Sequence, residues 1–390
     1  MKSVAVVGAS LAGWSAARAL RAQGFDGELM IVGAETHRPY DRPPLSKEFL
    51  AGQIDAAALA LESDDDDLRA SWRLGVAAVG LDAATGAVAL ADGSRVRADA
   101  VVLATGARAR CWPGAPGLAG VHTLRTLEDA VGLRAELTAG ARLAVIGAGF
   151  IGAEVASTAL KLGLAVTVIE AAPTPLAGPL GVRLGAVVAR LHTAHGVALR
   201  CGVAVAGLTG TDRVTGVALA DGSRVAADVV VCGIGAVPNI DWLRGGPLAL
   251  GDGVLCDTAG ATSLPNVVAV GDCAAWHEPA LGRPHRVEHW TGALERPAIA
   301  VTTLLSGADR ASAPVAKPPY FWSDQYGTRI QFAGIAGPDD DITIEDGDPE
   351  QGSFLAVYRR DGHPVAVLGV DQPRLFTRWR RQLWTAQACS

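Results

Sequence analysis

Two glycine-rich turns carry the clearest chemistry in this sequence, and each stands between a predicted buried strand and a predicted helix. The first turn reads Gly8-Ala-Ser10-Leu-Ala12-Gly13. Gly8 suits a tight turn and Gly13 permits close helix–strand packing, while Ser10 stands where a glycine usually lets the backbone approach a pyrophosphate. The helix N-terminus that follows offers free N–H groups and a positive dipole end to phosphates. Glu35, 22 residues past Gly13, can accept a hydrogen bond from a ribose hydroxyl.

The second turn has the complete fingerprint of a dinucleotide site, Gly147-Ala-Gly149-Phe150-Ile151-Gly152. Its acid is Glu170, 18 residues past Gly152, at the end of a strand predicted over 165–169. A carboxylate there repels a 2′-phosphate, and no arginine or lysine follows until Arg183. The second site is therefore predicted to prefer NADH over NADPH.

The two turns belong to a repeated design. Residues 91–99 (ADGSRVRAD) and 220–228 (ADGSRVAAD) are near copies, and each precedes an apolar strand and a glycine turn. The strands are unbroken runs of Val, Ile and Leu, typical of parallel strands buried on both faces. We expect two related doubly wound folds, each with a small hairpin at its repeated segment. A tightly held flavin and a visiting nicotinamide are the natural cofactor pair, because hydride can pass between them.

Composition excludes several other classes. The chain has 390 residues, 49% hydrophobic and 19% charged, and a net charge of −6, which argues against disorder and against nucleic-acid binding. No run of 18 charge-free apolar residues predicts a membrane span. Six cysteines without a CxxC spacing argue against zinc and iron–sulfur sites. The first twenty residues resemble a secretory signal only weakly, so we expect a cytoplasmic protein.

With these features, the sequence resembles the pyridine nucleotide–disulphide oxidoreductase superfamily. More narrowly, it is similar to the NADH-dependent ferredoxin reductases that serve cytochromes P450 and Rieske oxygenases, the putidaredoxin reductase type. The resemblance covers almost the whole chain. Besides the second fingerprint, the motifs that support it are PYDRPPLSK at 39–47, LATGARAR at 103–110, LRTLEDA at 124–130, GIGAVPN at 233–239, VGDCA at 270–274 and FWSDQYG at 321–327.

The resemblance implies an α/β protein with two Rossmann-like, doubly wound dinucleotide-binding domains and a C-terminal α+β domain. Residues 1–110 and 238–312 would form the FAD-binding domain, 111–237 the NAD-binding domain and 313–390 the C-terminal domain. The aromatic-rich, alternating segment 318–336 agrees with strands at the start of the last domain.

The resemblance also implies the cofactor contacts. Lys47 and Glu154 would be the catalytic pair, an ion pair beside the flavin where a cation stabilises the charge that reduction brings; an exposed helix face is the alternative for Glu154. Asp272 would contact the ribityl and phosphate region, or cap the segment after it. The other implied contacts are Gly8, Ser10, Ala12, Gly13, Glu35, Arg42, Ala78, Thr105, Gly106, Arg125, Gly147, Gly149, Phe150, Ile151, Gly152, Glu170, Gly233, Ile234, Gly235 and Gly271.

Four residues of the resemblance concern the flavin ring and the nicotinamide pocket beside it. Glu288 would hold the nicotinamide ribose or amide, and Trp290 would offer its backbone N–H to the flavin O2 at the start of a helix predicted over 292–305. An ordinary helix start is the alternative. Trp322 would lie near the flavin on the side where electrons leave, or would pack in the core. Phe150 would gate the nicotinamide pocket, with simple packing as its alternative.

Thiol chemistry is not expected. Disulphide members of the superfamily carry a CxxxxC pair facing the flavin, whereas residues 43–47 read PPLSK. Electrons would therefore pass from the flavin directly to an outside acceptor. Cys273 is interpreted as a small buried side chain rather than a nucleophile.

The predicted activity is transfer of hydride from NADH to FAD, followed by single-electron transfer to a [2Fe–2S] ferredoxin that supplies a cytochrome P450 or Rieske oxygenase. Reduction of rubredoxin, a quinone or a small molecule is one alternative, and a non-catalytic redox-sensing flavoprotein is another. Four arginines in PRLFTRWRRQLW at 373–384 would form a docking face for the ferredoxin or an ordinary solvated helix face. The acidic run Asp64–Asp67 is interpreted as a solvated loop.

Overall fold

The computed structural model describes residues 1–63, 67–82, 85–113, 117–307 and 316–388, with side chains up to Leu383 in the last helix. The chain forms two compact units. Unit 1 comprises Met1–Asp41, Ala60–Arg108 and Val237–Pro319, and unit 2 comprises Arg42–Leu59, Ala109–Ala236 and Tyr320–Ser390. Most of the predicted acidic loop, residues 64–66, lies outside the described residues, as does the predicted boundary between 312 and 313.

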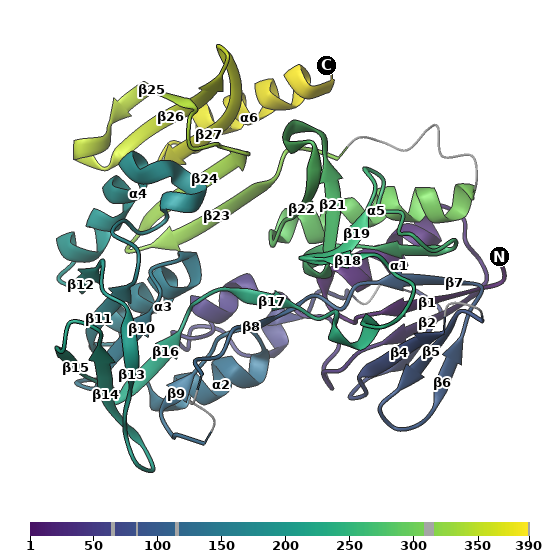
Figure 1. The fold of residues 1–390 in the computed structure, drawn as a ribbon, viewed down its shortest axis with the longest axis horizontal. Helices are drawn as coiled ribbons and strands as arrows, with labels where there is room; N and C mark the ends of the chain where they lie inside the picture. The colour runs from purple at the N-terminus through teal and green to yellow at the C-terminus, as the bar shows by residue number, and fades with distance from the viewer. Residues whose placement is uncertain (64–66, 83–84, 114–116, 308–315, 389–390) are drawn as a thin grey trace. The chain divides into compact units, whose positions relative to one another are not determined.

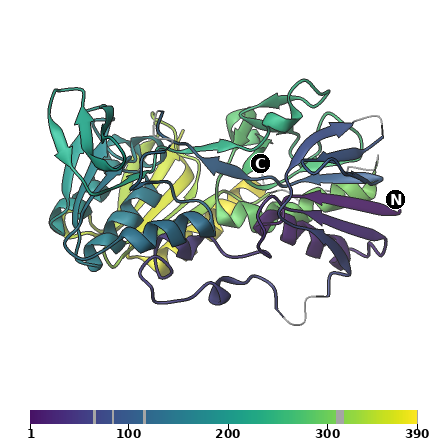
Figure 2. The same cartoon turned by 90° about the horizontal axis from the view of Figure 1, so that it is seen from below.

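Unit 1 is built on a parallel sheet in the order β20-β7-β1-β2-β3. Its central strands are apolar on both faces, which confirms the predicted doubly wound core. Helices α1 and α5 pack against each other beside this sheet (Figures 1 and 2). The elements are β1 (Ser3–Val7), α1 (Leu11–Ala22), β2 (Glu28–Val32), β3 (Ala70–Arg73), β7 (Ala100–Leu103), β20 (Val267–Ala269) and α5 (Trp290–Ser306).

Two smaller sheets complete unit 1, the first antiparallel and the second mixed, because β19 and β21 run parallel. The first joins β4 (Ala78–Asp82), β5 (Ala87–Leu90) and β6 (Arg95–Arg97), and the repeated segment at 91–94 makes its predicted hairpin turn. The second has the order β18-β19-β21-β22. Its strands are β18 (Leu250–Gly251), β19 (Gly253–Cys256), β21 (Ala274–Glu278) and β22 (Arg283–Arg286). Cys273, in the short helix η4 (Gly271–Cys273), is fully buried, and burial raises the pKa of its thiol, as expected for a packing residue.

Unit 2 repeats the design. Its parallel sheet has the order β12-β11-β10-β16-β9, and a three-stranded meander β13-β14-β15 contains the second hairpin at 220–223. The elements are η1 (Pro43–Ser46), β9 (Val121–His122), α2 (Leu127–Glu136), β10 (Arg142–Ile146), α3 (Phe150–Lys161), β11 (Ala165–Glu170), α4 (Ala177–Ala194), β12 (Ala198–Cys201), β13 (Val205–Gly210), β14 (Val214–Leu219), β15 (Arg224–Ala226) and β16 (Val229–Cys232).

The C-terminal part of unit 2 is an antiparallel sheet of order β23-β24-β27-β26-β25 (Figure 1). One face packs against α4, and the other is covered by α6. A break in α4 at Gly181 (φ 75°) leaves the carbonyl of Leu180 to accept a hydrogen bond from the Tyr358 hydroxyl at 2.8 Å. The elements are β23 (Tyr320–Gln325), β24 (Thr328–Gly334), β25 (Asp341–Asp348), β26 (Ser353–Arg360), β27 (His363–Val370) and α6 (Pro373–Ala388).

The two units do not coincide with the three predicted domains. Residues 42–59 belong to unit 2, although they lie inside the predicted first FAD segment, and the C-terminal sheet shares unit 2 with the predicted NAD domain. Strands β8 (Ala107–Ala109) and β17 (Ala236–Pro238) stand at two points where the chain passes between units. The assignment of domains to individual cofactors stays a prediction.

Candidate functional site

The first glycine turn connects β1 to α1 in unit 1. Gly8 has φ +124°, and a Cβ there would lie 1.9 Å from the Ala104 carbonyl oxygen. A Cβ on Gly13 would lie 1.8 Å from the Gly8 carbonyl oxygen. Both positions therefore exclude any other residue. Ser10 is the N-cap residue of α1, with extended backbone, so it accommodates a side chain at the position that is usually glycine.

Other predicted contacts of unit 1 gather at the carboxyl ends of the same parallel strands. Glu35 follows β2 and accepts a hydrogen bond from the Tyr40 hydroxyl. The hydroxyl of Thr105 donates to the Asn239 carbonyl at 2.7 Å, and the Asn239 backbone N–H donates to Gly106. Gly271 has φ +68°, and a Cβ there would lie 2.7 Å from the Ala12 side chain. Ligands of open α/β sheets bind at this strand end.

Two more predicted residues lie at the start of α5. Trp290 is the first residue of the helix, and its indole N–H donates to Asp41 at 2.7 Å. Glu288 forms an ion pair with Arg286, whose side chain is only 10% exposed and also lies 3.2 Å from Asp252. Sequence reasoning did not identify Arg286, because nothing in the local pattern distinguishes it from a surface charge. It fixes the Glu288 carboxylate within unit 1.

Two further predictions concern unit 1. Asp272 lies within η4, and strand β21 follows, so its alternative role as the cap of a following helix is wrong. Ala78 begins β4 and is half-buried against the core. His289 occupies the N-cap position of α5 without a side-chain capping bond, and burial lowers its pKa to about 4, so its ring is neutral at pH 7.

The second glycine turn connects β10 to α3 in unit 2. A Cβ on Gly147 would lie 2.3 Å from the Gly233 carbonyl oxygen, and one on Gly152 would lie 2.2 Å from the Gly147 carbonyl oxygen. Gly149 differs, because its backbone is ordinary (φ −73°, ψ 179°) and a Cβ there would meet nothing within 4 Å. The fold does not require glycine at 149, whereas the approach of a pyrophosphate would.

The rim of this turn also fits a dinucleotide. Glu170 accepts hydrogen bonds from the backbone N–H groups of Ala148 and Ala172, both at 2.9 Å, which aims its carboxylate at the turn. Ile151 is 47% exposed at the start of α3, an apolar surface that a ligand could cover. Across the turn, Gly233, Ile234 and Gly235 follow β16, with Gly235 at φ +96°.

The segment at 42–47 also belongs to unit 2. Arg42 donates through its Nη1 to the Arg125 carbonyl at 2.6 Å, so two predicted flavin contacts touch each other. Thr126 caps α2 through a capping box with Asp129, which fixes the backbone next to Arg125.

Lys47 and Glu154 form the predicted ion pair, 2.7 Å from Nζ to Oε2. The alternative of an exposed helix face is wrong, because Glu154 is 3% exposed. Its carboxylate also accepts hydrogen bonds from the hydroxyls of Ser46 (2.5 Å) and Ser323 (2.7 Å). A buried carboxylate is tolerable only when it is paired and hydrogen-bonded, and this one is both. Sequence reasoning missed Ser46 and Ser323.

Strand β23 alternates between its two faces. Phe321 packs on Phe150 with ring centroids 4.5 Å apart, which shows that Phe150 has a packing partner. On the other face, Trp322 stacks on Tyr320 at 6.0 Å and lies below the guanidinium of Arg329. Trp322 is half-buried, so it is not a core residue of the sheet.

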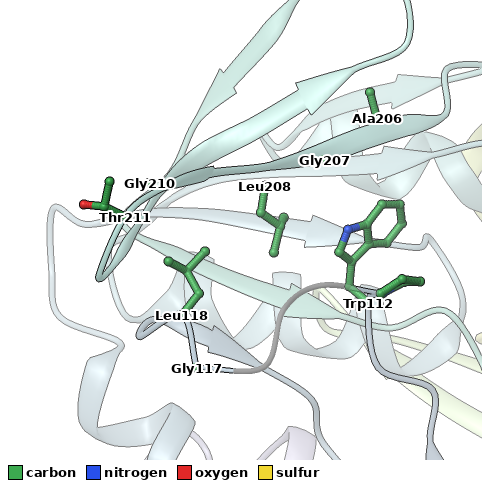
Figure 3. A pocket seen from close by; sticks show the side chains of 9 residues that line it. Trp112, Gly117, Leu118, Ala206, Gly207, Leu208, Gly210 and Thr211 are labelled. Carbon is green, nitrogen blue, oxygen red and sulfur yellow. The ribbon is translucent and has the colours of Figure 1, made fainter.

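A cavity of about 510 Å³ lies elsewhere in unit 2, between the β13–β14 hairpin and the residues 112–113 and 117–118 (Figure 3). Trp112, Leu118 and Leu208 line it, and none of its lining residues is a predicted site residue. Within the described ranges, no cluster of three His, Cys, Asp or Glu side chains could hold a metal ion. No helix among those ranges is both long and apolar enough to cross a membrane.

The fold and these two turns define a dinucleotide-dependent oxidoreductase. A family model described as pyridine nucleotide-disulphide oxidoreductase matches residues 2–296, and one described as reductase C-terminal matches residues 320–389. The chain belongs to the pyridine nucleotide-disulphide oxidoreductase family, which confirms the predicted resemblance and fold class. Membership implies FAD and NADH as cofactors, as predicted.

Within this family, the chain is similar to several ferredoxin reductases. The chain is 41% identical to the ferredoxin reductase component of chlorobenzene dioxygenase from Cupriavidus sp. (strain PS12), over 96% of this chain and 90% of the relative. It is 36% identical to putidaredoxin reductase from Pseudomonas putida, over 96% and 90% of the two chains. The crystal structure of the covalent putidaredoxin reductase–putidaredoxin complex superimposes with a TM-score of 0.93 at 34% identity, covering 98% of this chain and 93% of that chain.

Proposed function

We propose that this protein is an NADH-dependent ferredoxin reductase that holds FAD and reduces a [2Fe–2S] ferredoxin, which in turn supplies a cytochrome P450 or Rieske oxygenase. One observation carries the proposal: two dinucleotide turns lie in one chain whose 43–47 segment has no cysteine. Relatives named as ferredoxin reductase components of oxygenase systems support the choice of acceptor.

The turn of unit 1 would hold the FAD pyrophosphate at the α1 N-terminus, and Glu35 would hold its ribose. The turn of unit 2 would hold the NADH pyrophosphate against Gly149, and the Glu170 carboxylate would accept from the adenosine ribose and repel a 2′-phosphate. When bound, FAD converts the two-electron hydride of NADH into single electrons. Lys47 would place a cation beside the flavin, and Glu154 would keep that ammonium in position.

The overall reaction balances without a thiol. One NADH and two oxidised ferredoxins give NAD⁺, one proton and two reduced ferredoxins, because each [2Fe–2S] cluster accepts one electron. The exposed arginines of α6, including Arg374 and Arg378, would attract an acidic ferredoxin and set its on-rate. The cytoplasm, where NADH is regenerated, is the proposed location.

Ferredoxin-dependent cytochrome c reduction tests the proposal. We expect NADH to reduce cytochrome c slowly with the reductase alone and much faster once a [2Fe–2S] ferredoxin is added. If no ferredoxin of a broad set raises the rate while rubredoxin or a quinone does, the acceptor is wrong. If NADH turnover with ferricyanide is no faster than with free flavin, the protein is not a reductase.

A further inference from the structure

A hydrogen-bonded chain runs from the C-terminal sheet to the predicted catalytic pair within unit 2. The Gln325 side-chain N–H donates to the Ser323 hydroxyl at 3.0 Å, and Ser323 donates to Glu154 Oε1 at 2.7 Å. Glu154 Oε2 accepts from Lys47 at 2.7 Å. Gln325 is 1% exposed and Ser323 is fully buried, so water does not compete for these bonds.

The direction of each bond is fixed by chemistry. An amide N–H can only donate, and an ionised carboxylate can only accept. Gln325 therefore occupies a lone pair of the Ser323 oxygen, which leaves the hydroxyl proton for Glu154. The serine rotor is locked in the orientation that holds Oε1, while Oε2 is held by Ser46 and Lys47.

The backbone geometry explains how β23 brings the Ser323 hydroxyl to the Glu154 carboxylate. Successive residues of a strand point to opposite faces, so Phe321 and Ser323 share the face that carries the packing against α4. They meet Phe150 and Glu154, which are four residues apart and lie on one face of α3. Three residues further along that helix, Ser157 accepts a hydrogen bond from the backbone N–H of Tyr326, at the end of the strand.

We propose that Ser323, oriented by Gln325, is a positioning residue for the reductive half-reaction: it holds the Glu154 carboxylate so that the Lys47 ammonium stays fixed beside the flavin. The C-terminal sheet thereby sets the rate of flavin reduction as well as packing against α4. This inference rests on the proposed function, since it assigns Lys47 and Glu154 their role toward FAD.

Ser323→Ala removes the hydroxyl that donates to Glu154. Gln325→Met removes the N–H that orients the Ser323 hydroxyl, and it leaves the Glu154 carboxylate unchanged. The chain offers a matched control, because Ser353 in β26 accepts a hydrogen bond from Gln372 at 3.0 Å in the same sheet and touches neither Glu154 nor Lys47. FAD-loaded variants are mixed anaerobically with NADH, and the limiting rate of flavin reduction is separated from the NADH dissociation constant. The flavin midpoint potential is measured by dye equilibration.

We expect Ser323→Ala to lower the limiting rate about fivefold, the effect of losing a hydrogen bond of about 1 kcal/mol in the transition state. Its NADH dissociation constant should stay within about twofold of wild type, and its midpoint potential should fall because the ammonium is less well fixed. Gln325→Met should show a smaller loss of the same kind, and Ser323→Thr, which keeps the hydroxyl, should retain most of the rate. Ser353→Ala should match wild type.

An unchanged limiting rate and potential in Ser323→Ala overturn the inference, and so does an equal loss in Ser353→Ala. If Ser323→Ala does not retain FAD, the comparison of Gln325→Met with Ser353→Ala decides by the same criteria. Failure of the proposed function is distinguishable, because wild-type protein itself would then not be reduced by NADH.

Discussion

Replacing Gly149 with alanine separates binding from folding at the second glycine turn. The backbone at 149 suits any residue, and a new Cβ meets no protein atom within 4 Å. Alanine lowers the entropy of the unfolded chain but is a poorer N-cap than glycine, so the two small effects oppose each other. The free energy of unfolding should therefore change by less than about 1 kcal/mol.

The loss should appear in cofactor binding instead. A methyl group at 149 would keep the pyrophosphate from the backbone N–H groups at the start of α3. Hydrogen bonds to charged groups contribute about 1.5–3 kcal/mol, and each 1.4 kcal/mol is tenfold in affinity. The dissociation constant for NAD⁺, measured by titration calorimetry on the FAD-loaded protein, should rise about 10- to 150-fold.

Two other glycines provide the controls. Gly132→Ala, in α2, also adds a Cβ that meets nothing within 4 Å, and it should leave NAD⁺ binding unchanged. Gly152→Ala places a Cβ 2.2 Å from a backbone oxygen and should lower the melting temperature sharply. Wild-type NAD⁺ affinity in Gly149→Ala would refute the reasoning, as would a loss of stability comparable to that of Gly152→Ala.

Three further perturbations have defined outcomes. Glu154→Gln deprives the Lys47 ammonium of its carboxylate, so it should lower the free energy of unfolding by on the order of 3 kcal/mol and slow flavin reduction by NADH. A variant whose calorimetric stability and flavin reduction rate both equal those of the wild type would contradict this prediction. Burial lowers the pKa of His192 from 6.5 to about 4, so its stabilising contribution is complete above pH 6.5 and is lost as the pH falls toward 4. About 2 kcal/mol should disappear between pH 8 and pH 5, and His192→Gln should flatten that part of the melting-temperature profile; an equally steep profile would count against it. Reversing Arg374 and Arg378 to glutamate should lower the ferredoxin-dependent rate in a salt-sensitive way while ferricyanide reduction stays unchanged, and an equal fall in both rates would argue against docking at α6.

The features that could be predicted from the sequence are those whose signals are local. Gly8 and Gly147 each follow an apolar run within a few residues, and both occupy positive-φ turns that exclude side chains. The hairpins at 91–94 and 220–223 follow from short turn motifs. Strands β3 and β4 have a weaker local signal, because β3 reads ASWR and β4 is interrupted by Gly80, so neither is an unbroken apolar run.

The features that escaped depend on residues far apart in the chain. Ser46 is separated from Glu154 by 108 residues and Ser323 by 169, so no spacing rule could connect their hydroxyls to this carboxylate. Arg286 was missed because its low exposure is a result of tertiary packing, and one of its two carboxylate partners, Asp252, lies far earlier in the chain. The grouping of 42–59 with unit 2 likewise follows from tertiary contacts, including the hydrogen bond of Thr158 to the Ser46 carbonyl.

Anaerobic titration of the FAD-loaded protein with NADH tests the central claim most directly. We predict that one equivalent of NADH per flavin bleaches the visible absorbance completely, that NADPH does so far less effectively, and that no second equivalent is consumed by a disulphide. A flavin that NADH leaves oxidised, or protein that cannot be loaded with FAD at all, would contradict the account.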